Sequence, residues 1–213
     1  MKNIELKVES VKKIFNKKII FQNVNFLLRE KQSIAIVGKN GSGKSTLAKI
    51  VCGLLAPTGG SIQFVIDNVT ILPHDAQQHL GFVAPYINLY DEFSGLENLL
   101  LFAKIRNLSI DAQKRSEELL RRFSIYQQRH DEVRTYSSGM KQRLKYCAAL
   151  LHSPAILVLD EPQANLDEEG VSVVRSIMTE QKENGILIIA TNDNDDLHYV
   201  ESEVSIEKLK VVQ

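Results

Sequence analysis

The sequence contains no apolar run long enough to cross a membrane. A spanning helix needs about 18 or more consecutive apolar residues, and no stretch of the 213 residues approaches that length. The first residues also lack the apolar core of a signal peptide. These two absences predict a chain that stays in the cytoplasm.

Cysteine and histidine are scarce and widely separated. The two cysteines, Cys52 and Cys147, lie in apolar helical patterns without a C-x-x-C motif, and the five histidines show no metal-ligand spacing. We therefore expect two buried, reduced thiols rather than a disulfide or a metal site.

An excess of charge of either sign is also missing. The 26 Lys and Arg residues balance 26 Asp and Glu residues, which leaves no formal net charge. A protein that holds nucleic acid mainly through its phosphates needs a positive excess, so we do not expect nucleic acid as a partner. The length suits one α/β domain with an inserted subdomain, residues 1–213.

One glycine-rich stretch fits the pattern G-x-x-x-x-G-K-[ST] at every fixed position: Gly38, Lys39, Asn40, Gly41, Ser42, Gly43, Lys44, Ser45 and Thr46. A β-branched apolar run precedes it and a helical pattern follows it, which is the context that this motif requires. Its glycines allow backbone N–H groups to point at a polyphosphate. Lys44 supplies positive charge at the outer phosphates, and the Ser45 hydroxyl is a candidate Mg²⁺ ligand. The alternative is a glycine-rich turn with a solvated lysine.

Apolar patterning divides the chain into three parts. Residues 4–8, 19–21 and 24–28 predict antiparallel strands, and 61–65 and 80–83 predict further strands. A helical block follows, with a capping box at Ser94, a cap at Asp111 and a helix over 138–151, so 87–152 is predicted to be a helical subdomain. Residues 1–86 and 153–213 then form the nucleotide-binding core. Its buried strands near 155–159 and 185–190 predict a parallel sheet.

Two acidic residues end the buried run at 155–159. Asp160 is placed to hold Mg²⁺ beside Ser45, and Glu161 is placed to activate a water as general base. A surface turn is the alternative for this segment. Phe15, near the start of the chain, is either a core aromatic or a projecting ring that stacks on a base.

A second motif, 136–143, reads Tyr-Ser-Ser-Gly-Met-Lys-Gln-Arg and resembles the signature segment of ATP-binding cassette (ABC) ATPases. The family pattern is Leu-Ser-Gly-Gly-Gln followed by x-Gln-Arg, so Tyr136, Ser138 and Met140 depart from it. Ser137, Ser138 and Gly139 alone would suit an ordinary helix cap. Asn165-Leu166-Asp167 is similar to the family's D-loop, with Asp167 as its acidic residue.

The resemblance covers essentially the whole chain. It implies a P-loop NTPase fold of the ABC type: α/β, with a mixed sheet core, an antiparallel β subdomain and an inserted helical subdomain. It also implies that ATP and Mg²⁺ bind, that Phe15 stacks on adenine, and that two subunits close head to tail. The signature residues of one subunit then complete the nucleotide site of the other: Ser137, Ser138, Gly139 and Met140.

Two departures from the family concern hydrolysis. Pro85 stands where the family has a glutamine that senses Mg²⁺ and the attacking water, and Asn192 stands where the family has a histidine on the γ-phosphate. Proline offers neither a donor nor a side-chain acceptor, and asparagine carries no positive charge. We expect ATP binding with slow hydrolysis in the isolated subunit.

The resemblance implies the ATP-binding subunit of a transporter, held at the inner face of the cell membrane by an integral-membrane partner and paired with a second copy or a related ATPase. Residues 86–94, followed by Glu97-Asn98-Leu99, resemble exporter cassettes and, most closely, the ATPase of the cytochrome c maturation (haem exporter) system. Two alternatives stay open: a soluble assembly or remodelling ATPase without transport, and a regulatory ATP-binding module with little turnover.

Overall fold

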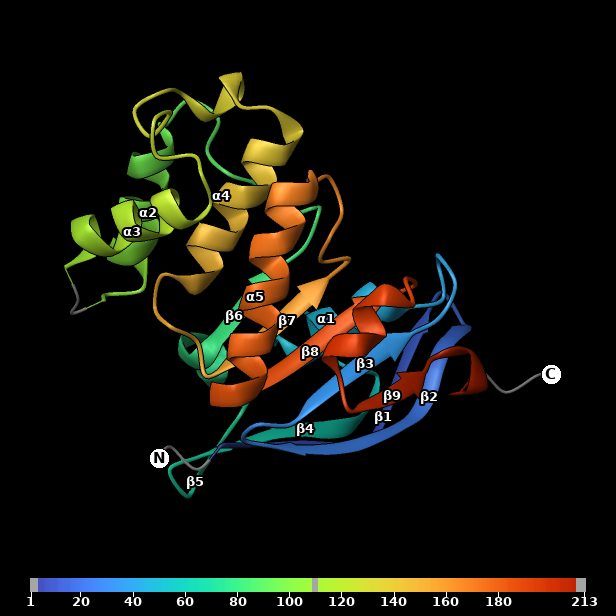
Figure 1. Ribbon diagram of the computed structural model, residues 1–213. Coiled ribbons are helices and arrows are strands. Elements are labelled where there is room, and N and C mark those ends of the chain that lie inside the picture. Colours follow the sequence, from blue (N-terminus) through green and yellow to red (C-terminus); the bar gives the residue numbers. More distant parts are fainter. Residues whose placement is uncertain (1–3, 109–110, 210–213) are drawn as a thin grey trace.

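The computed structural model of the protein describes residues 4–108 and 111–209, so both ends of the predicted domain lie outside the described part. Two β-sheets and their covering helices make up this part (Figure 1). The larger sheet is parallel throughout, and its order is β6 (Leu80–Val83), β7 (Ile156–Asp160), β8 (Ile186–Thr191), β3 (Ser33–Val37) and β9 (Ser202–Ser205). Parallel strands bring all their carboxyl ends to one edge. At this edge the glycine-rich loop 38–46, called the cradle below, meets the acidic pair Asp160 and Glu161.

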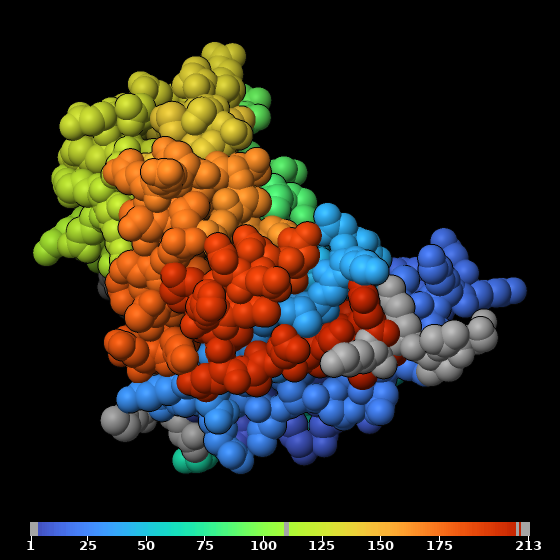
Figure 2. All heavy atoms as spheres, turned by 45° about the vertical axis from the view of Figure 1, so that its right-hand side comes forward, coloured from blue at the N-terminus to red at the C-terminus, as the bar shows by residue number. Residues whose placement is uncertain are grey.

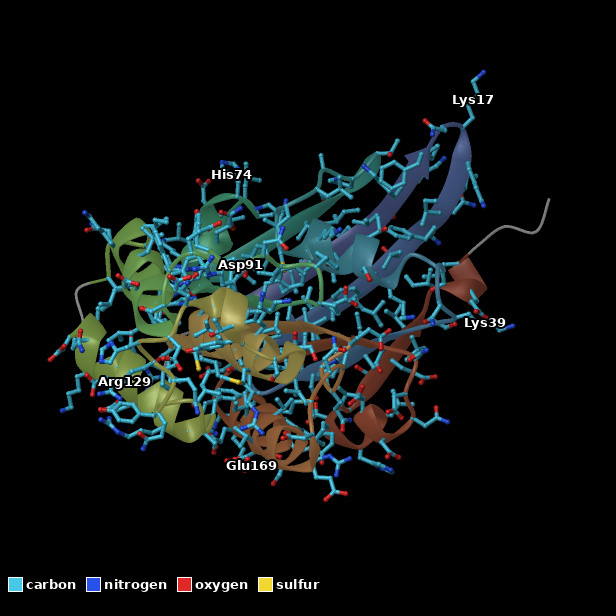
Figure 3. The ribbon with its side chains drawn as sticks, turned by 90° about the horizontal axis from the view of Figure 1, so that it is seen from above. Lys17, Lys39, His74, Asp91, Arg129 and Glu169 are labelled. Atoms are coloured by element: carbon cyan, nitrogen blue, oxygen red, sulfur yellow. The ribbon has the colours of Figure 1, made fainter. Side chains whose placement is uncertain are left out.

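The second sheet is antiparallel, in the order β2 (Lys18–Arg29), β1 (Ile4–Phe15), β4 (Gly59–Ile66) and β5 (Val69–Ile71). Asn16 and Lys17 join β1 to β2 with φ of 46° and 65°. Positive φ at both turn residues matches the right-handed twist of the flanking strands, and it places Lys17 at the hairpin tip (Figure 3).

Strands β1 and β2 are each 12 residues long, more than the separate short runs that the sequence predicts. The pairing register of β1 with β2 shifts between Val8 and Val11 and again up to Ile14. Such bulges break the alternation of buried and exposed side chains without ending the strand. The alternating apolar pattern therefore predicted strands that were shorter than β1 and β2.

The helices cover the parallel sheet on both faces. Helix α1 (Lys44–Val51) packs between the two sheets, in a core that includes Ile36, Val158 and Ile188. The alternate side chains of the same strands, such as Leu159 and Ile189, face a second core shared with α4 (Ser138–Leu150) and α5 (Glu168–Asn184). This in-and-out alternation explains why the strands read as continuous apolar runs.

Helices α2 (Gly95–Ile105) and α3 (Ala112–Arg122) lie with α4 at one end of the molecule (Figure 1). The predicted capping box is confirmed: Ser94 Oγ accepts from Glu97 N, and Ser94 N donates to the Glu97 carboxylate at 2.8 Å. Asp111 caps α3 as expected. The subdomain boundaries at 87 and 152 stay a prediction.

Shorter elements complete the described part, and its cysteines behave as expected. The 3₁₀ helices are η1 (Asp75–His79), η2 (Val133–Thr135), η3 (Asp195–Tyr199) and η4 (Glu207–Leu209). Cys52 and Cys147 are free and buried, as expected. Among the described helices, none combines the length and the apolar character that a membrane crossing requires.

Candidate functional site

The glycine-rich stretch forms a loop between β3 and α1. Gly43 sits at the N-terminus of α1 with φ of 118°, and a Cβ added there would lie 2.6 Å from Ile20 Cγ2. Gly41 also has a positive φ, 74°, but faces open space. The loop thus depends on glycine at position 43 for both backbone conformation and room.

Lys44 lies across this loop rather than in solvent. Its side chain is 5% exposed, and Nζ donates to the carbonyls of Gly38 at 2.8 Å and Lys39 at 3.3 Å. Glu161 Oε1 lies 3.6 Å from the same Nζ. The alternative of a solvated lysine is therefore wrong, because the ammonium is held inside the turn.

An open cavity of about 290 Å³ lies against the loop. Residues from three segments line it, all of them predicted site residues except Ile20: Ile20, Asn40, Gly41, Gly43, Lys44, Ser45, Thr46 and Glu161. The amides that open α1 and the positive end of its dipole face an anion placed there. Ser42, within the loop, is buried, and its hydroxyl has no hydrogen-bond partner among the described residues. Figure 2 shows the loop region, in light blue, at the surface beside the red C-terminal segment.

Asp160 ends β7 and is 1% exposed, yet neither of its carboxylate oxygens has a hydrogen-bond partner among the described residues. A buried carboxylate without partners is costly, and a divalent cation would satisfy it. The donor set, one carboxylate together with the nearby Ser45 hydroxyl, consists of the oxygen ligands that Mg²⁺ prefers. The surface-turn alternative does not hold for Asp160.

Glu161 has a left-handed backbone, with φ of 50°, and its N–H donates to the Ala190 carbonyl at 2.8 Å. This contact fixes the backbone of Glu161, whose side chain lines the cavity. Burial raises the pKa of the Glu161 carboxyl, Lys44 opposes that rise, and the charge of Asp160 adds to it. A non-glycine residue held at positive φ beside perturbed groups is a common feature of functional sites.

Asn192 follows β8 and reaches the cradle from the other side. Its Nδ2 donates to Asn40 Oδ1 at 3.0 Å. Both residues line a second cavity of about 510 Å³ between the loop and the C-terminal segment, where Glu207 also accepts from Lys39 N at 3.0 Å. The Lys39 side chain projects outward at this surface (Figure 3).

Phe15 lies at the end of β1 and is 44% exposed, with Lys13 Nζ 4.7 Å from its ring centroid. Of the two possibilities that the sequence left open, the core position is therefore excluded. The ring projects from the sheet, with the Lys13 ammonium over one of its faces.

The signature residues lie apart from the cradle, and none of them is among the described residues that line the 290 Å³ cavity. Ser137 caps α4, and its Oγ accepts from Met140 N at 3.2 Å. Ser138 is exposed, while Gly139 and Met140 are half-buried. Within one chain the structure does not bring these residues to the phosphate loop.

Asp167 caps α5 by accepting from Gly170 N at 3.0 Å, and it also pairs with Arg143 of α4. The Arg143 guanidinium, followed by the Gly170 N–H, lowers the pKa of the Asp167 carboxyl. Sequence reasoning matched Arg143 to the motif but missed this partner, because spacing along the chain does not indicate that α4 and α5 pack side by side.

Two further residues were missed. Asp196 accepts from Thr191 Oγ1 at 2.6 Å and from Gln163 Nε2, so it ties together the segments that follow β7 and β8. Tyr86 lies beside Asp160 with its ring against Lys49. The only sequence signal for Tyr86 was its place next to Pro85.

Comparison with known proteins gives a consistent result. The family model described as "ABC transporter" matches residues 21–164. The linearmycin resistance ATP-binding protein LnrL of Bacillus subtilis is 32% identical over 92% of this chain, and the lipoprotein-releasing system ATP-binding protein LolD of Hydrogenovibrio crunogenus is 35% identical over 82%. The chain spans 62% of the length of LnrL and 79% of that of LolD.

Solved structures have the same fold. An ATP-binding subunit of an ABC transporter superposes with a TM-score of 0.83 at 27% identity, covering 94% of this chain and 85% of the other. A dimeric ATP-binding cassette in a post-hydrolysis state, bound to ADP and Pi, superposes with a TM-score of 0.82 at 24% identity, covering 94% and 93%. The fold class expected from the sequence is confirmed.

Proposed function

The chain belongs to the ABC transporter family and carries its ATPase domain, and from this premise we propose that it binds ATP and hydrolyses it in a head-to-tail dimer to drive a separate membrane partner. The observation that carries the proposal is the single cavity where Lys44, Ser45 and Glu161 meet beside the unsatisfied carboxylate of Asp160. Neither the phosphate loop nor the acidic strand end alone would support hydrolysis.

Nucleotide binding uses the backbone first. The N–H groups of the loop and of the first turn of α1 receive the phosphates, and Lys44 neutralises their charge from within the loop. Phe15 stacks on the adenine ring from the end of β1. The residues assigned to this site are Phe15, Gly38, Lys39, Asn40, Gly41, Ser42, Gly43, Lys44, Ser45 and Thr46.

Ser45 and Asp160 hold Mg²⁺ in this proposal. The ion would neutralise charge on the phosphates and fix their orientation. Glu161 acts as general base on the attacking water, and its position 3.6 Å from Lys44 Nζ keeps it at the end of the site where the terminal phosphate would lie. The remaining catalytic assignment is Asn192, whose amide can donate to that phosphate.

Hydrolysis is slow in the isolated subunit, and two features support this. Asn192 already gives one of its two amide hydrogens to Asn40, so only one is left for a phosphate, and the amide carries no positive charge. Pro85 supplies no polar side chain, and its carbonyl accepts from Lys145 Nζ at 2.6 Å. A turnover near the 1–100 s⁻¹ typical of phosphoryl-transfer enzymes, measured without a partner, would contradict this part of the proposal.

The position of the signature residues supports the dimer. Because Ser137, Ser138, Gly139 and Met140 surround the N-terminus of α4 but lie away from the chain's own cradle, they serve the nucleotide of a second subunit. Asp167, bonded to Arg143, links this helix end to α5. The second subunit is another copy or a related ATPase.

An integral-membrane partner docks, in this proposal, at a groove of about 230 Å³ next to residues 85–92, and its lining is mostly apolar: Leu54, Phe82, Ile87, Leu89, Phe102, Arg106, Lys145, Ala148 and Ala149. An amphipathic helix suits such a groove. Docking there would hold the chain at the inner face of the cell membrane. Closure of the dimer on ATP would then shift the partner's population between two states.

We extend the proposal to an exporter of the cytochrome c maturation type, with a haem-related cargo. Its support is the resemblance of residues 86–99, together with Pro85 and Asn192; the relatives LnrL and LolD carry other substrates in their names. Deleting the gene should reduce covalent haem on c-type cytochromes, measured by haem staining, and a Lys44→Ala copy should not restore it. Normal staining would remove the cargo assignment and leave the ATPase proposal intact.

A regulatory module with little turnover is the second candidate, favoured by Pro85 and Asn192. Phosphate release measured with and without the membrane partner separates the two, since only the transporter subunit is accelerated. Purification of the protein from detergent-solubilised membranes distinguishes a transporter subunit from a soluble assembly ATPase. A polytopic membrane protein should be recovered with it only if the chain drives transport.

A further inference from the structure

Tyr86 directly follows Pro85. Pro85 is the residue that stands where the family has a glutamine that senses the metal. Its ring lies under the ammonium of Lys49, with Nζ 3.9 Å from the ring centroid, and its other neighbour is the Phe82 ring at 6.3 Å between centroids. The preceding carbonyl, that of Pro85, accepts from Lys145 Nζ at 2.6 Å. Both the loop backbone and the ring of Tyr86 are therefore anchored.

The anchor places Tyr86 along the metal side of α1. Lys49 comes one helical turn after Ser45, and residues four apart lie on the same face of a helix. The ring that packs on Lys49 thus runs beside the face that carries the Ser45 hydroxyl. At 42% exposed, Tyr86 is partly open to solvent.

Val83 pairs with Leu159 across β6 and β7, so the segment that leads from β6 to Tyr86 runs beside the end of β7, where Asp160 lies. Burial raises the pKa of Tyr86, and Asp160 raises it further through its charge and as a hydrogen-bond acceptor. Neither oxygen of Asp160 has a hydrogen-bond partner among the described residues, so both can accept from a ligand. A ligand held by Asp160 would therefore lie within reach of the phenol.

Resting on the proposed function, we propose that Tyr86 is a positioning residue that replaces the absent glutamine, its hydroxyl bonding to a water or phosphate oxygen held beside Asp160. A phenol both donates and accepts a hydrogen bond, as the glutamine amide does, whereas the Pro85 side chain does neither. The loop that leads to the membrane-partner groove at Ile87 and Leu89 thereby senses the metal–nucleotide site.

The test removes only the hydroxyl. Tyr86→Phe keeps the ring and its contact with Lys49, so the fold is retained. Mn²⁺ titrated into protein saturated with ADP, with free Mn²⁺ followed by electron paramagnetic resonance, should bind about three- to tenfold more weakly, the loss of one hydrogen bond. ADP affinity measured in EDTA should not change.

Tyr90→Phe is the matched control. It is the same substitution four residues on, at a ring that is 48% exposed and stacked on Phe93 at 5.6 Å, and it should bind Mn²⁺ as the wild type does. Equal Mn²⁺ affinity in Tyr86→Phe, Tyr90→Phe and the wild type overturns the inference while the proposed function stands. A wild type that binds no ADP overturns both.

Discussion

Single residues in the site carry roles that neighbouring residues of the same type do not. Glu161 faces the Lys44 ammonium inside the cavity, whereas Glu168, at the start of α5, is exposed. Gly43 is enclosed by Ile20, whereas Gly41 is open. Each pair therefore supplies its own control.

Replacing Glu161 by Gln should slow ATP hydrolysis by about 10²–10⁴-fold, because the amide cannot accept the proton of the attacking water. Nucleotide affinity should change little, since the side chain keeps its size. Phosphate release and nucleotide titration measure the two effects separately. Glu168→Gln should leave both unchanged, and a Glu161→Gln protein with wild-type turnover would exclude Glu161 as the base.

Replacing Gly43 by Ala should abolish measurable nucleotide binding, because the new Cβ would lie 2.6 Å from Ile20 and the φ of 118° is unfavourable for alanine. Gly41→Ala meets no atom within 4 Å and only has the strain of φ at 74°, about 1–2 kcal/mol. Isothermal titration with ADP should separate the two variants. Equal binding would mean that the loop is not the phosphate site.

A few side chains determine where the helices begin and how they contact one another. Ser94 and Glu97 begin α2 with reciprocal hydrogen bonds, and Asp167 begins α5 while pairing with Arg143 of α4. The first interaction is local and readable from spacing; the second joins two helices that are distant in sequence.

Ser94→Ala should lower the free energy of unfolding by about 1 kcal/mol, the usual cost of a lost N-cap. Ser172→Ala, the same change at an exposed position inside α5, should have no such cost because alanine has the higher helix propensity. Urea unfolding of both variants against the wild type measures the difference. An equal effect at the two positions would rule out the capping contribution.

Asp167→Asn keeps an N-cap oxygen but removes the charge that faces Arg143. The folded-state pKa of Asp167 is lowered, so its stabilising contribution is present above the unfolded pKa and is lost as pH falls through the folded one. The stability gap between wild type and variant should therefore be constant near neutral pH and narrow only below about pH 4. Urea unfolding across this range measures it, and a gap that grows on acidification would contradict the assignment.

In the whole molecule the phosphate loop lies at the sheet edge, away from the start of α4, and in the proposed dimer these two surfaces complete one nucleotide site. ATP should therefore convert the Glu161→Gln protein from monomer to dimer, as measured by light scattering. Ser138→Arg, at the exposed start of α4, should prevent dimer formation while ATP still binds. Ser172→Arg, on α5, serves as the control; a Ser138→Arg protein that still dimerises would exclude this face.

Much of this protein could be read from sequence. The phosphate loop, the acidic pair, the buried strands, the capping box at Ser94 and the cap at Asp111 depend on residues close together in the chain, so spacing and periodicity were enough to predict them. Strand β9, Ser202–Ser205, escaped prediction because its polar residues form an edge strand whose pairing with β3 supplies what its composition does not. The length of β1 was hidden for a different reason, because its bulges break the alternation of buried and exposed side chains.

The sequence alone determined which residues can cradle a phosphate, because conformational freedom at glycine and charge at lysine are properties of the residues themselves. Only the tertiary structure decided that Phe15 projects from the sheet, that Asp160 is buried without a hydrogen-bond partner among the described residues, and that Tyr86 packs against Lys49. These facts depend on which distant segments pack together. Packing is a property of the folded chain as a whole, so no local pattern could have encoded it.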